Sequence, residues 1–356
     1  MTLTSPLRAS FLALSIALVA AGCGDDATNT PTPTPTPDAG RQPPRECPPG
    51  PNVCACADNG PPDFSQAEAG MATATSDSAQ QAALVRTNYW RTAAGLAPIN
   101  ANAQLEQAAM AHSTFMAQNA SNCWPGAHFE NEPGCMGYTG RTPFDRVAAT
   151  GYRASASGEV INWEATPTRS IDGWIWTVYH RTPFQDPSYT ETGFAAAPGR
   201  PGDSRRFHNT MEFARPQGGT AGMLTDVSLF PPPGTTGVPF QFQGNLEGPT
   251  PPTPATGRWP SGTVISMMFP TNDFSITTHK LYDGQCQEVA HSTFRSSRAA
   301  ASTVSDAQAD TNNSNPRFVF LYGDSRLASN TQYTVELRGT LNGAAWSRVW
   351  AFTTTP

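Results

Sequence analysis

The chain has 356 residues, of which 38% are hydrophobic and 14% are charged, and its formal net charge at pH 7 is -6. This length allows two ordinary domains with real cores, in addition to tails. The negative balance and the scattered arginines argue against a nucleic-acid-binding surface, so no nucleic-acid partner is expected.

Residues 1–22 have the pattern of an export signal. Arg8 supplies a positive charge, an apolar run follows, and small residues precede Cys23. A run of about 11 apolar residues cannot span a bilayer, which needs about 20. The pattern resembles a bacterial lipoprotein signal, in which Cys23 is lipidated, and an ordinary secretory signal cleaved near Ala20 or Gly22 is the alternative. We therefore expect a protein of the bacterial cell envelope, lipid-anchored, and extracytoplasmic or at the cell surface, with the membrane as a partner through its lipid.

Residues 23–77 are predicted to form a linker rich in Pro and Thr, with a cluster of cysteines. Its Thr-Pro repeat is typical of an extended polyproline spacer. The clustered cysteines are Cys47, Cys54 and Cys56, and Cys286 in the C-terminal half is the natural fourth partner. Exported thiols usually oxidise, so we expect disulfides, and a zinc knuckle with a further ligand is the alternative.

Helical patterns begin near Ser78, where apolar residues recur at helical spacing until Gly95. A second helix is expected from about Asn102 to Asn119. Its apolar stripe includes His112, which we interpret as a buried histidine of the scaffold. The alternative is that His112 lines a functional cleft.

An irregular loop follows, in which Cys123 and Cys135 bracket His128. A disulfide between these cysteines would restrict where His128 points. Thr142 is expected to cap a short helix. A further amphipathic helix is expected to end at His180, and strands are expected over residues 189–197 and 207–213.

The order of motifs in this region resembles the CAP superfamily, the secreted SCP-type domain of cysteine-rich secretory proteins, antigen 5 and plant pathogenesis-related proteins. The resemblance covers about residues 79–216. The motifs are Asn88-x-x-Arg91-x-x-x-Gly95-Leu96, Ala111-His112-Ser113-x-x-Met116, Gly140-Arg141-Thr142-Pro143-Phe144-Asp145-Arg146, Gly158-Glu159, Asp172-x-Trp174, His180-Arg181 and Tyr189-Thr190-Glu191-x-Gly193. It implies an α-β-α sandwich with a central antiparallel sheet, over residues 78–218, and a surface groove.

The resemblance also implies the residues of that groove. By position, His128 and His180 look like the two groove histidines of the family, and Glu159 looks like the glutamate of its Gly-Glu-Asn motif. Thr177 stands where animal members carry a second acid, so three groove residues remain. Two histidines and one carboxylate can provide three ligands to zinc or another divalent cation.

Residues 223–356 show short alternating runs and turn residues such as Asn342-Gly343, a pattern that predicts an all-β sandwich. It resembles the Ig-like modules that often follow exported bacterial domains. The expected fold is thus α+β, with a CAP-type sandwich followed by an Ig-like sandwich.

The motifs favour binding over turnover, because no His-Glu-x-x-His helix or Gly-x-Ser-x-Gly elbow is present. The leading hypothesis is an exported, lipid-anchored binding or interaction module, whose groove takes a divalent metal or a small-molecule, lipid or other envelope ligand. The alternatives are a metal-dependent hydrolase of envelope peptides or glycans, acting through His128, Glu159 and His180, and a structural spacer.

Overall fold

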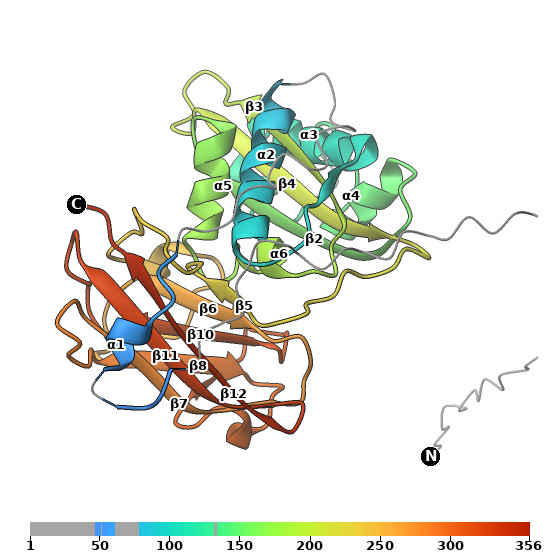
Figure 1. Cartoon of the computed structure of the whole chain (residues 1–356). Helices are drawn as coiled ribbons and strands as arrows, with labels where there is room; N and C mark the ends of the chain where they lie inside the picture. The colour runs from blue at the N-terminus through green and yellow to red at the C-terminus, as the bar shows by residue number, and fades with distance from the viewer. Residues whose placement is uncertain (1–46, 51, 61–77, 132–133) are drawn as a thin grey trace, which may run out of the picture. The chain divides into compact units, whose positions relative to one another are not determined.

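The structure is a computed structural model that describes residues 47–50, 52–60, 78–131 and 134–356 (Figure 1). The expected export signal, Cys23 and the Thr-Pro spacer lie outside these residues. Within the described part, none of the helices combines the length and the apolar composition needed to cross a membrane.

The first region is a mixed α/β fold. Its helices are α2 (Ser78–Ala93), α3 (Ala103–Gln118), η2 (Ser121–Cys123), α4 (Pro143–Ala149), α5 (Pro167–Ile175) and α6 (Thr182–Gln185). Its strands are β1 (Asn100–Ala101), β2 (Ala154–Asn162), β3 (Glu191–Pro198) and β4 (Phe207–Pro216), in the sheet order β1-β3-β4-β2. The three long strands pair antiparallel, whereas the two-residue strand β1 pairs parallel with β3, so the expected antiparallel sheet is mixed at this edge.

Helices cover both faces of this sheet. Because successive strand residues point to opposite sides, neighbouring residues of β4 pack against different helices. Met211 and Phe213 of β4 share a buried cluster with Trp90 of α2 and Trp174 of α5. Ala214, the next residue of β4, packs in a separate cluster on the other face with α3 and α4. The three layers implied by the resemblance are therefore present.

The helix ends largely follow the predicted signals. Asn102 caps α3, with its side chain accepting from the backbone N–H groups of Gln104 and Leu105. Gly193 lets α3 approach β3 closely, because a Cβ at this position would lie 2.1 Å from the backbone nitrogen of Glu106.

The helix that was expected to end at His180 ends at Ile175 instead. Trp176 leaves the helical conformation, and Thr177 bonds back to the carbonyl of Trp174 through its hydroxyl. The backbone N–H groups of residues 178–180 therefore do not bond within a helix. They donate instead to Glu247 of the C-terminal region.

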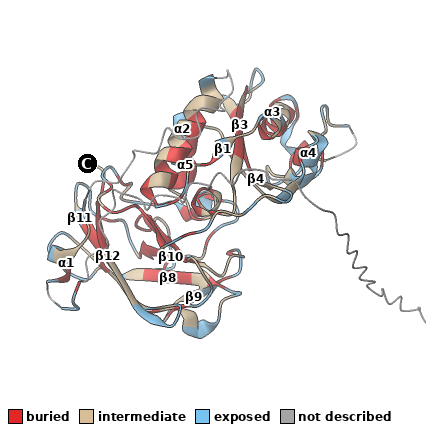
Figure 2. Cartoon of the chain, turned by 45° about the vertical axis from the view of Figure 1, so that its right-hand side comes forward, coloured by how far each residue is buried: buried red, intermediate tan, exposed pale blue. Residues whose placement is uncertain are grey.

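The C-terminal region consists mainly of strands. They are β5 (Ser228–Phe230), β6 (Val264–Met268), β7 (Phe274–Tyr282), β8 (His291–Ser296), β9 (Gln308–Asp310), β10 (Phe318–Gly323), β11 (Gln332–Leu341) and β12 (Ala344–Thr353), with the short helices η3 (Gly244–Leu246) and η4 (Ala301–Thr303). One sheet has the order β5-β6-β10-β8-β9 and the other β12-β11-β7. A common buried cluster joins residues of both sheets, so they pack as two layers. Figure 2 shows that the central strand β10 is buried.

The turn predicted at Asn342-Gly343 joins β11 to β12. Both residues have positive φ, 52° and 75°, as a two-residue hairpin turn with this sequence requires. The ten-residue register from Gln332 with Thr353 to Leu341 with Ala344 follows from it.

Three disulfides form among the described residues, which confirms the expectation of oxidised cysteines. They join Cys47 to Cys56, Cys54 to Cys286, and Cys123 to Cys135. The helix α1 (Val53–Cys56) and the residues beside it pack on β12, where Asp58 exchanges backbone hydrogen bonds with Val349 and Ala351. The cysteine cluster is thus fastened to the C-terminal region.

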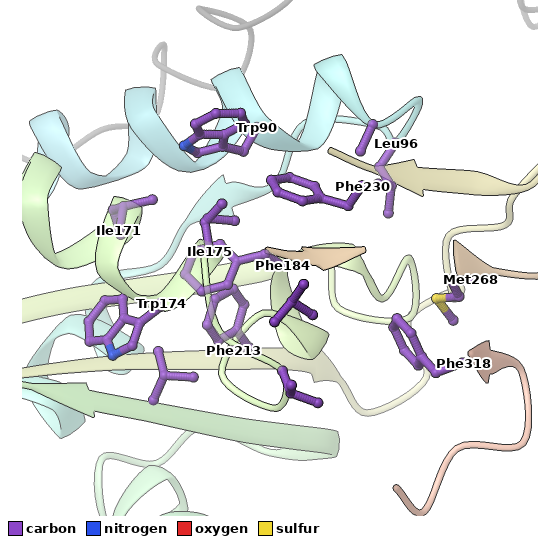
Figure 3. Close-up of a cluster of buried hydrophobic side chains, with 14 of the residues drawn as sticks. Trp90, Leu96, Ile171, Trp174, Ile175, Phe184, Phe213, Phe230, Met268 and Phe318 are labelled. Atoms are coloured by element: carbon purple, nitrogen blue, oxygen red, sulfur yellow. The ribbon is translucent and has the colours of Figure 1, made fainter. Parts of the chain in front are cut away.

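The two regions also share a core. Phe230 of β5 lies beside Trp90 of α2, with ring centroids 5.4 Å apart, and Figure 3 shows it among side chains of the first region. Arg181 extends across the same boundary, donating to the carbonyl of Val264 and to the hydroxyl of Ser266. The mixed α/β region and the β-sheets of the C-terminal region are therefore packed together through buried side chains.

Candidate functional site

His128 lies in the loop closed by the Cys123–Cys135 disulfide. Its backbone is fixed from two sides by buried side chains. His112 of α3 bonds to the carbonyl of Ala127 at 2.8 Å, and Arg146 of α4 donates to the carbonyl of His128 at 3.1 Å. The prediction that His112 is a buried scaffold residue is confirmed, and its second ring nitrogen contacts Glu130 at 2.8 Å.

The side chain of His128 is oriented by Glu159. Its Nδ1 lies 2.8 Å from Oε1 of Glu159, and Arg146 donates to the other carboxylate oxygen at 2.5 Å. The Glu159 side chain is fully buried, whereas the His128 side chain is 30% exposed. A buried carboxylate that receives one N–H of an imidazole leaves Nε2 as the free position, so His128 can accept a hydrogen bond or a proton from a ligand.

Glu212 lies directly opposite Glu159 in the register of β2 and β4. It is fully buried, and among the described residues no donor group gives a hydrogen bond to either of its carboxylate oxygens. An ionised carboxylate in this position would be strongly destabilising. The geometry therefore favours a neutral, protonated Glu212 behind the Glu159–His128 pair.

The pKa shifts of the two glutamates are opposite in direction. Burial raises the pKa of Glu212 well above its ordinary value, and the charge of Glu159 raises it further. Burial would also raise the pKa of Glu159, but the charge of Arg146 and the bond from His128 outweigh it and hold this pKa below its usual range. The favoured state of the pair therefore has Glu212 protonated and neutral and Glu159 ionised.

His180 has a different carboxylate partner. Its Nδ1 lies 3.0 Å from Glu247, which belongs to the C-terminal region and follows η3. The same carboxylate accepts from the backbone N–H groups of Val178, Tyr179 and His180 at 2.9, 2.7 and 3.1 Å. Burial raises the pKa of Glu247, but these bonds outweigh it and lower the pKa overall. Three successive N–H groups form an anion-binding turn, and Glu247 occupies it.

These contacts bear on the zinc expectation. The structure brings His128 and Glu159 together and joins His180 to Glu247. Within the described ranges, no three His, Cys, Asp or Glu side chains gather as metal ligands. Glu159 is also paired with Arg146, whose permanent charge opposes a second cation there. In this arrangement the three predicted residues do not fit one shared metal ion, and metal occupancy stays a prediction.

Four buried residues of the site were not anticipated in this role: Glu130, Arg146, Glu212 and Glu247. No sequence signal pointed to Glu212, because an acid between Met211 and Phe213 in a strand is the ordinary alternating pattern, which places the acid on the side facing solvent. Glu247 had none either, since it stands in an irregular segment far from His180 in sequence.

Several exposed apolar side chains follow His128 in sequence. Six large hydrophobic residues are exposed among the described residues, and three of them fall in the segment that follows His128: Phe129 at 42%, Met136 at 63% and Phe144 at 50%. Arg141 lies over the Phe129 ring, 5.9 Å from its centroid. We call His128, Phe129, Met136 and Phe144 the His128 surface.

A small cavity lies near the boundary of the two regions, with an interior of about 10 Å³. It is lined by Trp90, Ala94, Ile175, Arg181, Phe184, Gln185 and Phe230. Such a volume holds about one water molecule, and the unpaired buried nitrogen of Arg181 offers it a hydrogen bond. This cavity is too small for a lipid.

Comparison with known proteins locates the family signal in the first region. Residues 84–213 match the family model described as CAP, cysteine-rich secretory protein family. A similar solved structure is an extracellular protein containing an SCP domain from Bacillus anthracis str. Ames, at 20% identity and a TM-score of 0.30. That match covers 38% of this chain and 40% of the other. Comparison with curated proteins gave no match.

Proposed function

Because residues 84–213 carry a CAP domain, we propose that the chain is an exported binding protein, lipid-anchored at Cys23, that recognises an envelope ligand through the His128 surface. The three disulfides support an oxidising compartment outside the cytoplasm. The signal-like N-terminus and the spacer support anchoring, and the two-layered C-terminal region is proposed to be an Ig-like accessory module.

The observation that carries the proposal is the exposed, oriented imidazole of His128, which three exposed apolar residues follow in sequence. Its Nδ1 is fixed by a buried carboxylate, so Nε2 is presented in one direction at little cost in conformational entropy. Phe129, Met136 and Phe144 are exposed apolar side chains in the segment that follows His128, and we propose that they form one patch with it. Exposed apolar patches mark interaction sites, and aromatic residues and Met are enriched in them. The ligand class that fits is a small or extended molecule with an apolar part and a hydrogen-bonding group.

Native mass spectrometry of the purified full chain tests this proposal. We expect a co-purified ligand whose occupancy falls about tenfold or more in His128→Ala and in Phe129→Ser, since each removes a central contact. Met223→Ser is the matched control, because Met223 is an exposed apolar residue outside this surface, at 87%. Absence of any bound mass, or equal losses in the control, would refute the proposal.

The hydrolase alternative makes a separate prediction. It requires stoichiometric zinc by elemental analysis, and a hydrolytic activity that disappears in both His128→Ala and His180→Ala while the fold survives. The separate carboxylate partners of these two histidines support binding over this alternative. Zinc at one equivalent in the wild type, lost in both variants, would reverse that preference.

A further inference from the structure

Two histidines, His279 and His291, lie next to each other in the C-terminal region. β7 and β8 are connected by a turn that carries Cys286, and Val289 donates to the carbonyl of Leu281 at 2.7 Å. Continuing this hairpin register places His279 of β7 opposite His291 of β8. The two strands then diverge, because β7 pairs with β11 in one sheet and β8 pairs with β10 in the other.

Backbone carbonyls fix the hydrogens on both rings. His279 Nε2 lies 2.8 Å from the carbonyl oxygen of Ser305, and His291 Nδ1 lies 2.9 Å from that of Val289. A carbonyl only accepts, so each of these nitrogens carries a hydrogen. The remaining nitrogens, Nδ1 of His279 and Nε2 of His291, therefore hold lone pairs when the rings are neutral.

These two lone-pair nitrogens are 3.0 Å apart, with the ring planes at 85°. The hydroxyl of Thr293, 3.1 Å from His279 Nδ1, can supply one hydrogen to one of them. Two acceptors this close repel each other unless a hydrogen or a cation lies between them.

We propose that His279 Nδ1 and His291 Nε2 together bind one divalent ion of the copper, nickel and zinc group, with the Thr293 hydroxyl and water completing the coordination. For metal–nitrogen bonds of about 2.0–2.1 Å, a nitrogen separation of 3.0 Å corresponds to an angle at the metal of about 90–100°. This angle suits adjacent positions of a tetragonal site, which Cu²⁺ and Ni²⁺ prefer, and tetrahedral Zn²⁺ needs only a small widening. Both histidines are partly exposed residues, which leaves a route by which an ion can enter.

The surroundings also match what metal-binding histidines require. A ligating imidazole usually donates its other N–H to a carbonyl or carboxylate, which sets the tautomer and the ring orientation. Both His279 and His291 do so before any ion arrives. The Cys54–Cys286 disulfide additionally holds the turn between the two strands. The affinity order expected for an unselective N,O site is Cu²⁺ above Ni²⁺ and Zn²⁺.

The test is a titration of the full chain, freed of metal by chelator dialysis, with Cu²⁺ and separately with Zn²⁺. We expect one ion per chain, nitrogen hyperfine structure from two imidazoles in the Cu²⁺ electron paramagnetic resonance spectrum, and affinity about tenfold or more weaker in His279→Gln and in His291→Gln. The matched control is Lys280→Gln, at the residue with an exposed side chain that follows His279 on β7, which should bind as the wild type does. Unchanged affinity in both single variants, or loss in the control, would overturn the assignment.

A measurement on the unsubstituted chain removes any dependence on folding of the variants. Diethyl pyrocarbonate acylates accessible imidazoles, and peptide mass spectrometry locates the modified residues. Bound Zn²⁺ should protect His279 and His291 and leave the modification of His128 and His180 unchanged. Equal modification of His279 and His291 with and without Zn²⁺, or no binding in the titration, would show that the pair is not a metal site.

Discussion

Glu247 is expected to contribute strongly to the joining of the two regions, and its replacement by Ala is the sharpest test. The side chain is 1% exposed and accepts from three backbone N–H groups and from His180. Glu247→Ala removes the acceptor and leaves the donors, including the N–H of the fully buried Val178, without a partner.

The magnitude follows from those donors. A buried donor left unsatisfied costs about 1–3 kcal/mol, and hydrogen bonds to a charged group are worth more than neutral ones. Water can reach the half-buried Tyr179 and His180, so we expect a loss of about 2–5 kcal/mol in the free energy of unfolding. Glu247→Gln retains one carbonyl oxygen and should lose less than Glu247→Ala.

Urea unfolding followed by tryptophan fluorescence measures this loss. Glu164→Gln is the control, because Glu164 forms an exposed pair with Arg169 and should change stability by less than about 1 kcal/mol. The pKa of Glu247 is lowered by folding, so its contribution is present above the ordinary value of 4.5. The difference between the wild type and Glu247→Gln should therefore shrink as the pH falls below that value. A loss no larger than in the control, or a difference that grows in acid, would refute the reasoning.

Two further predictions concern the neighbourhood of His128. Folding raises the pKa of Glu212, so the wild type loses stability as the pH rises above 4.5. Glu212→Gln should therefore have the larger free energy of unfolding at pH 8, and its advantage over the wild type should narrow towards pH 4.5. Urea unfolding across this pH range measures the difference, and a difference that is constant with pH would contradict the prediction. Joint replacement of Cys123 and Cys135 by Ser opens a short loop and should lower the free energy of unfolding by about 3 kcal/mol, as measured by calorimetry. An unchanged transition temperature would show that this disulfide does not stabilise the fold.

Much of the fold was predictable because its signals are local. Asn102 at the start of α3 and Asn342-Gly343 between β11 and β12 each specify a backbone conformation by their own chemistry. Alternating runs likewise predicted the central strands of the C-terminal region. The helix predicted to reach His180 failed because its periodicity continued past Ile175, where the backbone instead donates to Glu247.

The candidate site was predictable only in part, because its pairings depend on tertiary contacts. The resemblance grouped His128, Glu159 and His180, and the structure joins the side chains of His128 and Glu159. The assignment of His180 to the same ligand set rested on resemblance, and the sequence contains no sign that Glu247 contacts it. The neutral Glu212 depends on its register with Glu159, which only the assembled sheet defines.

The attachment of the cysteine cluster has a mechanical consequence. The Cys54–Cys286 disulfide and the backbone bonds of Asp58 to β12 join the segment before the CAP domain to the C-terminal sheets. If the N-terminus is tethered at Cys23, a force acting between the tether and the C-terminal sheets enters at Cys47 and passes through the disulfides of the cysteine cluster into those sheets. The CAP domain, which lies between Cys54 and Cys286 in sequence, is then a closed branch that carries no tension. The His128 surface would keep its shape while the tether is stretched.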